Sequence, residues 1–122
     1  MQVQMTHDIL DVEIFEQAKS LLGESFSQVV EAYLEDAANY LVQIHSGLSD
    51  NNLEQAAKAA HPLKSSSASL GLVGVSEIAK SIELGAKSAV STEALKVMAS
   101  DLEQTLNIAR DMLHVACDAA EQ

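Results

Sequence analysis

The chain has 122 residues, the length of one domain with one hydrophobic core. Apolar residues make up 48% of it but aromatic residues only 3%, and it contains one proline, a balance typical of all-α proteins. The net charge of −11 argues against nucleic acid and anionic membranes as partners.

Three further features bear on the compartment. No stretch reaches about 18 uninterrupted apolar residues, so we expect no membrane span. The first residues lack the basic and then apolar order of a secretory signal. The single cysteine, Cys117, has no partner for an internal disulfide, which favours a reducing, cytoplasmic compartment.

The first predicted helix follows a partly ordered tail at residues 1–9, and we expect residues 10–122 to form one domain. Asp11 is placed to cap the start of this helix, and Gly23, after Leu22, is placed to end it in a left-handed conformation. Its spacing predicts that it buries Ile14, Phe15, Ala18 and Leu21.

The second predicted helix begins at Ser25, which with Gln28 forms a capping-box pattern, and runs to about Leu48. All four aromatic residues lie in these first two helices. We interpret them as core residues, and the alternative is an aromatic edge that lines a partner surface. The predicted core positions are Phe26, Val29, Val30, Tyr33, Ala37, Tyr40, Leu41, Ile44 and Leu48.

The third predicted helix follows a polar turn at residues 49–52, with Asn51 or Asn52 as its cap, and ends at a break over residues 71–74. Pro62 lies inside it, so either the helix bends and continues or it ends there. The apolar spacing continues in phase past Pro62 and favours the first reading. The core-facing positions are Leu53, Ala56, Ala60, Leu63, Ser67 and Leu70.

Two more helices are predicted, from about Val75 to Ala86 and from a cap at Ser91 or Thr92 toward the end of the chain. The short connections imply antiparallel neighbours. We therefore predict an all-α, antiparallel, up-and-down four-helix bundle, with the short first helix lying across one end. The core positions of the last two helices are Val75, Ile78, Ala79, Ile82, Leu95, Met98, Leu102, Leu106, Ala109, Leu113 and Ala116.

One histidine, His61, falls on the solvent side of the third helix, with Lys64 one turn later. A neutral imidazole is a nucleophile near neutral pH, and Lys64 would offset the charge of a phosphoryl group placed on it. Residues 54–87 carry a net charge of +1, whereas the rest of the chain carries −12. The alternative is an ordinary exposed histidine beside a solvated lysine. The small neighbours are Ala57, Ser65 and Ala68.

The segment His61-Pro62-Leu63-Lys64-Ser65-Ser66-Ser67, followed by Leu70-Gly71, resembles the signature of histidine phosphotransfer (HPt) domains. These domains carry phosphoryl groups in multistep phosphorelays, and the resemblance extends over most of the chain. The sequence departs from the family pattern at position 65, where glycine is frequent, and in the proline that directly follows the histidine.

Two further residues are candidates for the site. Glu83, next to core residue Ile82, points to the side of His61 if the two helices form a hairpin, and it would then orient the imidazole through Nδ1. The resemblance supports this role, and the alternative is an exposed glutamate paired with Lys87. Ser65 borders His61 as a possible phosphoryl contact, Lys80 ranks below Lys64 as a cation, and Ser67 is predicted to bond to a carbonyl four residues earlier.

Other chemistry finds little support in the sequence. The histidines His7, His45 and His114 lack partners at metal-ligand spacing, so we expect surface or edge residues and no metal site. No glycine-rich phosphate loop or ATP motif occurs, so we expect no cofactor and no kinase activity of its own. Any Mg²⁺ is expected on a partner receiver domain.

These features, with the resemblance, predict a phosphocarrier that accepts a phosphoryl group on His61 from a receiver-domain aspartate and passes it to another. The expected partners are response-regulator receiver domains and a hybrid sensor histidine kinase, with the carrier as a monomer. Two alternatives stay open. In the first alternative the chain is the phospho-accepting domain of a larger histidine kinase. In the second it is a helical module that binds receivers or kinases without carrying phosphate.

Overall fold

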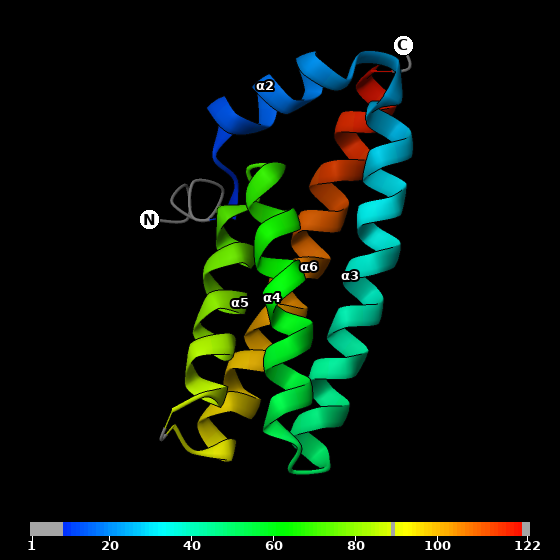
Figure 1. The fold of residues 1–122 in the computed structure, drawn as a ribbon. Coiled ribbons are helices and arrows are strands. Elements are labelled where there is room, and N and C mark those ends of the chain that lie inside the picture. The colour runs from blue at the N-terminus through cyan, green and yellow to red at the C-terminus, as the bar shows by residue number, and fades with distance from the viewer. Residues whose placement is uncertain (1–8, 89, 121–122) are drawn as a thin grey trace.

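The computed structural model describes residues 9–88 and 90–120, and within these ranges all regular structure is helical. Four long helices run up and down as an antiparallel bundle, and a short helix lies across one end of it (Figure 1), which confirms the predicted fold. The elements are α2 (Val12–Leu22), the 3₁₀ turn η1 (Gly23–Ser25), α3 (Phe26–Ser49), α4 (Leu53–Ser69), α5 (Val73–Ala86) and α6 (Thr92–Ala120).

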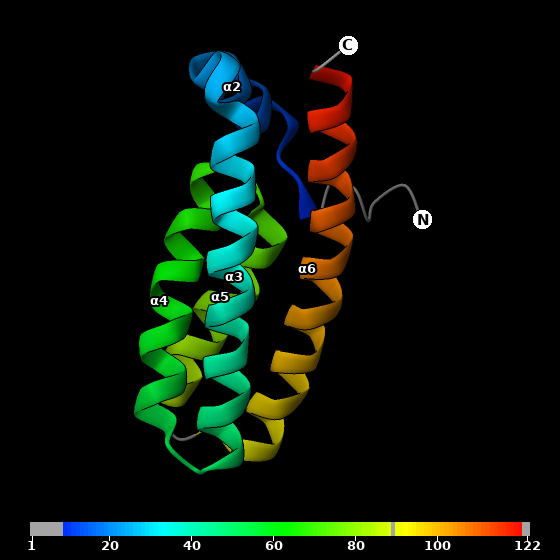
Figure 2. The same ribbon diagram turned by 90° about the vertical axis from the view of Figure 1, so that its right-hand side faces the viewer.

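Each of the four long helices packs against two neighbours around a common core. Helix α4 packs against α3 and α5, and α6 packs against α3 and α5 from the opposite side (Figures 1 and 2). None of the described helices has both the length and the apolar composition needed to cross a membrane. The predicted tail at residues 1–9 lies outside the described residues except for Ile9, whose side chain is buried.

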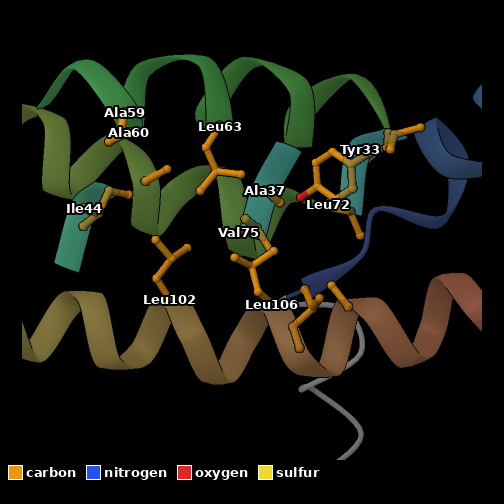
Figure 3. Packing of buried hydrophobic residues seen from close by; sticks show 14 of the residues in the cluster. Tyr33, Ala37, Ile44, Ala59, Ala60, Leu63, Leu72, Val75, Leu102 and Leu106 are labelled. Carbon is orange, nitrogen blue, oxygen red and sulfur yellow. The ribbon is translucent and has the colours of Figure 1, made fainter. Parts of the chain in front are cut away.

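The core runs along the centre of the bundle and draws on all four long helices (Figure 3). The cluster includes Leu63 of α4, Val75 of α5, Ile44 of α3 and Leu102 of α6, and all four side chains are fully buried. The spacing of apolar residues on α4 is confirmed, because five of its six predicted core positions are buried and Leu53 is half-buried.

Three helix starts use the side chains that the sequence offered. Asp11, Asn52 and Ser91 each accept a hydrogen bond from the backbone N–H three residues later, at 3.1, 3.2 and 3.1 Å. Asn52 rather than Asn51, and Ser91 rather than Thr92, is therefore the cap. Gly23 has a φ of 54°, the positive value expected of the residue that ends α2.

Two details of the predicted helix starts were wrong, although α3 does begin directly after Ser25. Ser25 makes no capping hydrogen bond, because η1 joins α2 to α3 and leaves Ser25 in a helical conformation with φ −81° and ψ −6°. A capping side chain needs an extended backbone to reach the N–H groups ahead of it. Helix α5 begins at Val73 rather than Val75, because Gly71, with a φ of 79°, completes the turn early.

Helix α2 touches the bundle along a narrow side. Phe15 is buried, as predicted, but Leu21 is 88% exposed and Ile14 is also exposed, so these two core assignments were wrong. The helix lies across the end of the bundle, so only one row of its side chains can be buried against the other helices. Its position is fixed by the Asp11 N–H, which donates to the carbonyl of Gly71 at 2.7 Å.

Pro62 lies inside α4, and the helix continues through it to Ser69. The reading in which Pro62 ends the helix is therefore wrong. Because proline has no N–H, the carbonyl of Lys58 lacks its usual donor four residues ahead. Because α4 continues past Pro62, His61 lies on a helix rather than on a loop.

Candidate functional site

His61 stands in the middle of α4 on the side that faces α5, with 62% of its side chain exposed. Its Nδ1 lies 2.8 Å from Oε2 of Glu83. An ionised carboxylate only accepts hydrogen bonds, so Nδ1 is the nitrogen that carries the proton. The other ring nitrogen, Nε2, then keeps its lone pair for chemistry.

Glu83 is almost fully buried, at 5% exposure, yet three groups donate to it. Besides His61, the ammonium of Lys64 lies 2.8 Å from Oε1, and that of Lys87 lies 3.2 Å from Oε2. The hydrogen bond from Lys64 does most to lower the pKa of Glu83, to about 2, against burial, which raises it; His61 and Lys87 lower it further. The carboxylate of Glu83 is therefore ionised at neutral pH.

His61, Lys64, Glu83 and Lys87 form what we call the Glu83 cluster. The sequence offered two readings of Glu83, contact with His61 or pairing with Lys87, and the structure contains both contacts. Lys64 was expected to stand beside the imidazole, and its ammonium instead lies on the far oxygen of Glu83. Its predicted effect on a phosphoryl group stays a prediction, as do the roles of the other cluster members.

The short turn between α4 and α5 explains why these residues meet. Two antiparallel helices joined by a tight turn place residues at equal distances from that turn side by side. Glu83 follows Ile82, which is fully buried, so its side chain emerges at the α4–α5 seam. Ser76 of α5 also donates to the carbonyl of Lys64 at 2.9 Å, which fixes the two helices in register.

A groove of about 570 Å³ opens beside His61 on the α4–α5 surface. Of the three small neighbours predicted for His61, one lines the groove and two do not. Ala57 lines it, although it is buried, whereas Ser65 and Ala68 are exposed and lie outside the groove. The lining residues are Glu54, Ala57, Lys58, His61, Glu83, Ala86 and Lys87.

The serines of the motif differ in their contacts. The hydroxyl of Ser65 is exposed and donates to the carbonyl of His61 at a long 3.5 Å. Ser67 was predicted to bond to a carbonyl of its own helix, and this was wrong: its hydroxyl pairs with the hydroxyl of Tyr33 at 2.7 Å in the core. Burial raises the pKa of Tyr33 to about 12, although the bond to Ser67 lowers it in part.

The remaining histidines lie away from the cluster. His45 pairs with Glu103 at 3.1 Å and His114 with Glu31 at 3.9 Å, each pair joining α3 to α6 at the surface. His7 lies outside the described residues. Within residues 9–88 and 90–120, no group of three or more histidine, cysteine or acidic side chains is arranged to bind a metal ion.

A second groove, of about 370 Å³, lies where α2, α3 and α4 meet. Most of its lining is apolar, and it includes Tyr40 of α3 and Leu70, the residue that follows α4. Sequence reasoning missed it, because its walls come from three helices and no single helix carries the pattern of the groove. Tyr40, an aromatic residue at the margin of the α3 core stripe, was the available signal.

Fold and motif together define the class of the molecule. The chain matches the Hpt domain family over residues 28–111, more than half of its length, and therefore belongs to that family of histidine phosphotransfer domains. The resemblance seen in the sequence is thus confirmed. Members of this family are phosphocarriers rather than kinases.

One solved relative has the same fold. The structure is similar to the crystal structure of histidine-containing phosphotransfer protein B (HptB) from Pseudomonas aeruginosa PAO1, with a TM-score of 0.82. The two sequences are 17% identical, and the match covers 88% of this chain and 92% of that one. At this identity the likeness concerns the fold. Among curated proteins, none is similar enough to this chain to count as a match.

Proposed function

We propose that this domain carries a phosphoryl group on Nε2 of His61, taking it from the aspartate of one receiver domain and giving it to the aspartate of another. The observation that supports this most strongly is the 2.8 Å contact between Nδ1 of His61 and Glu83. It favours the tautomer that leaves Nε2 free, on a side chain that is 62% exposed and therefore accessible to a partner.

The transfer of the phosphoryl group requires no proton to leave the imidazole ring. As the N–P bond forms at Nε2, the P–O bond of the aspartyl phosphate breaks and the electron pair returns to the aspartate oxygen. The Nδ1 proton stays in its hydrogen bond to Glu83, so the ring becomes a phosphorylated imidazolium beside a carboxylate. The reverse reaction uses the same geometry, with neutral imidazole as the leaving group.

Charge supports the same function. Phosphoryl transfer depends mostly on positioning and on electrostatic stabilisation, and the receiver's Mg²⁺ would supply much of the latter. Lys64 adds positive charge from its place on Glu83, one turn from His61. The exposed hydroxyl of Ser65 bonds to its helix only at 3.5 Å, so it is free to turn toward a phosphoryl oxygen.

Receiver docking would use the surface around His61 and the groove between α2, α3 and α4. Relay contacts are transient, and small, partly apolar interfaces suit them. The groove of about 370 Å³ offers apolar walls formed by α2, α3 and α4. We propose receiver domains and a hybrid sensor kinase as partners, a monomeric carrier and a cytoplasmic setting.

The direct test uses a phosphorylated receiver domain as donor. We expect acid-labile, alkali-stable label on the carrier and none on His61→Gln. The matched control is His45→Gln, an exposed histidine on α3 that should label as wild type does. Label that persists in His61→Gln would refute the site.

Other outcomes separate the alternatives. Binding to the receiver without label would favour a docking module. Label from a kinase and ATP, but none from any phosphorylated receiver, would favour the acceptor domain of a kinase.

A further inference from the structure

The two lysines on Glu83 are held differently. Lys64 is 29% exposed and is the donor to Oε1, at 2.8 Å. Lys87 is 62% exposed, lies farther away at 3.2 Å, and shares Oε2 with Nδ1 of His61. The contact of Lys87 with Glu83 is thus longer than that of Lys64 and more exposed to water. Glu83 can lose it and still have one donor on each oxygen, Lys64 on Oε1 and His61 on Oε2.

The place of Lys87 relative to the imidazole also distinguishes it. Lys87 and His61 line the same groove of about 570 Å³, whereas Lys64 is not among its lining residues. Because both donors bond to Oε2, at 3.2 and 2.8 Å, the Lys87 ammonium lies no more than about 6 Å from Nδ1. The four-carbon stem of lysine allows its ammonium to cover such a distance by rotation.

We propose that Lys87 is the residue that contacts the phosphoryl group on His61: its ammonium exchanges Oε2 of Glu83 for a phosphoryl oxygen, while Lys64 remains on Oε1. This rests on the proposed function, since it requires phosphorylation of His61. Lys64 then positions Glu83, and Lys87 makes the direct contact.

The exchange leaves every group in the cluster with a partner. After Lys87 departs, Oε2 still accepts from Nδ1 and Oε1 still accepts from Lys64. If Lys64 moved instead, an oxygen of an almost fully buried carboxylate would lose its donor, which is a costly state. The ammonium gains a charge-assisted bond to a group with about two negative charges, a stronger acceptor than one carboxylate oxygen already shared with the imidazole.

The test uses phosphoramidate, a small donor that needs no receiver. Phosphoramidate carries its own proton on nitrogen near neutral pH, so its P–N bond breaks with the electron pair going to ammonia while the new N–P bond forms at Nε2 of His61. Phosphorus-31 NMR then follows the titration of the phosphohistidine oxygens with pH. A cation in contact with the phosphoryl group lowers the pKa of those oxygens, a change that a residue with a purely structural role would not cause.

In Lys87→Gln we expect this titration to move up by roughly one pH unit. Lys87→Arg should restore the wild-type midpoint, because it keeps the charge. Lys80→Gln replaces an exposed lysine of α5 that lies outside the groove; it is the matched control and should titrate as wild type does. Lys64→Gln should shift the midpoint less than Lys87→Gln.

An unchanged midpoint in Lys87→Gln, or a larger shift in Lys64→Gln, would overturn the assignment. Either result would leave the carrier function intact, because that function is tested by label from a phosphorylated receiver. Failure of both phosphoramidate and the phosphorylated receiver to modify His61 would overturn both proposals.

Discussion

Replacing Glu83 by glutamine removes the negative charge on which His61, Lys64 and Lys87 converge. In the folded protein the pKa of this carboxyl is lowered from 4.5 to about 2. Each pKa unit corresponds to about 1.4 kcal/mol of folding free energy, so a shift from 4.5 to about 2 sets an upper limit of roughly 3.5 kcal/mol. Because water reaches two of the three donors and screens them, we expect Glu83→Gln to lose about 1–2 kcal/mol at neutral pH.

The pH dependence of this loss has a definite sign. A lowered pKa in the folded state means that the stabilisation is complete above pH 4.5, the ordinary value, and is lost as the pH falls toward 2. Glutamine does not titrate. The difference in unfolding free energy between wild type and Glu83→Gln should therefore shrink across that interval, as measured by urea denaturation followed by circular dichroism.

Glu54→Gln is the matched control. Glu54 pairs with Lys58 at 3.8 Å, and both side chains are largely exposed. Such a pair contributes little, so we expect a change within about 0.5 kcal/mol and no trend with pH from this site. If Glu83→Gln were as stable as wild type at neutral pH, or if the difference grew on acidification, the account of the cluster would be refuted.

Three further substitutions test the local packing of the fold. Tyr33→Phe leaves the buried hydroxyl of Ser67 without its 2.7 Å partner, and we expect a loss of about 1–3 kcal/mol in urea denaturation; an unchanged stability would contradict the buried hydrogen bond. Gly71→Ala should cost at least about 2 kcal/mol, because φ is 79° and a Cβ would lie 2.8 Å from the backbone nitrogen of Phe15. Gly23→Ala, with a φ of 54° but no atom within 4 Å of the added Cβ, should cost only about 1 kcal/mol, and equal losses in the two variants would argue against this close approach.

The sequence predicted those features that depend on local periodicity. The spacing on α4 placed Leu63 in the core and His61 outside it, because both follow from the helical repeat alone. The contact between His61 and Glu83 was one of two readings, and a short hairpin was enough to suggest it. Asp11 capped its helix as expected, since capping is a contact between near neighbours.

The features that the sequence could not predict depend on neighbours distant in the chain. Ser67 bonds to Tyr33 of α3, and no pattern within α4 reveals which residue of another helix lies opposite. Leu21 fits the apolar stripe of α2, yet the helix crosses the bundle end and leaves it uncovered. The attachment of Lys64 to Glu83 was missed for the same reason, because a lysine stem reaches acceptors on an adjacent helix.

Pro62 gives α4 a local energetic conflict directly after His61. A proline in a helix interior costs roughly 3 kcal/mol, and here the cost falls on the helix that presents the imidazole. The rest of the bundle tolerates this loss because its core is filled from all four long helices. Local conflicts of this kind are typical of segments whose residues serve a function other than folding. In this chain the conflict lies next to the exposed imidazole of His61 and not in the buried core.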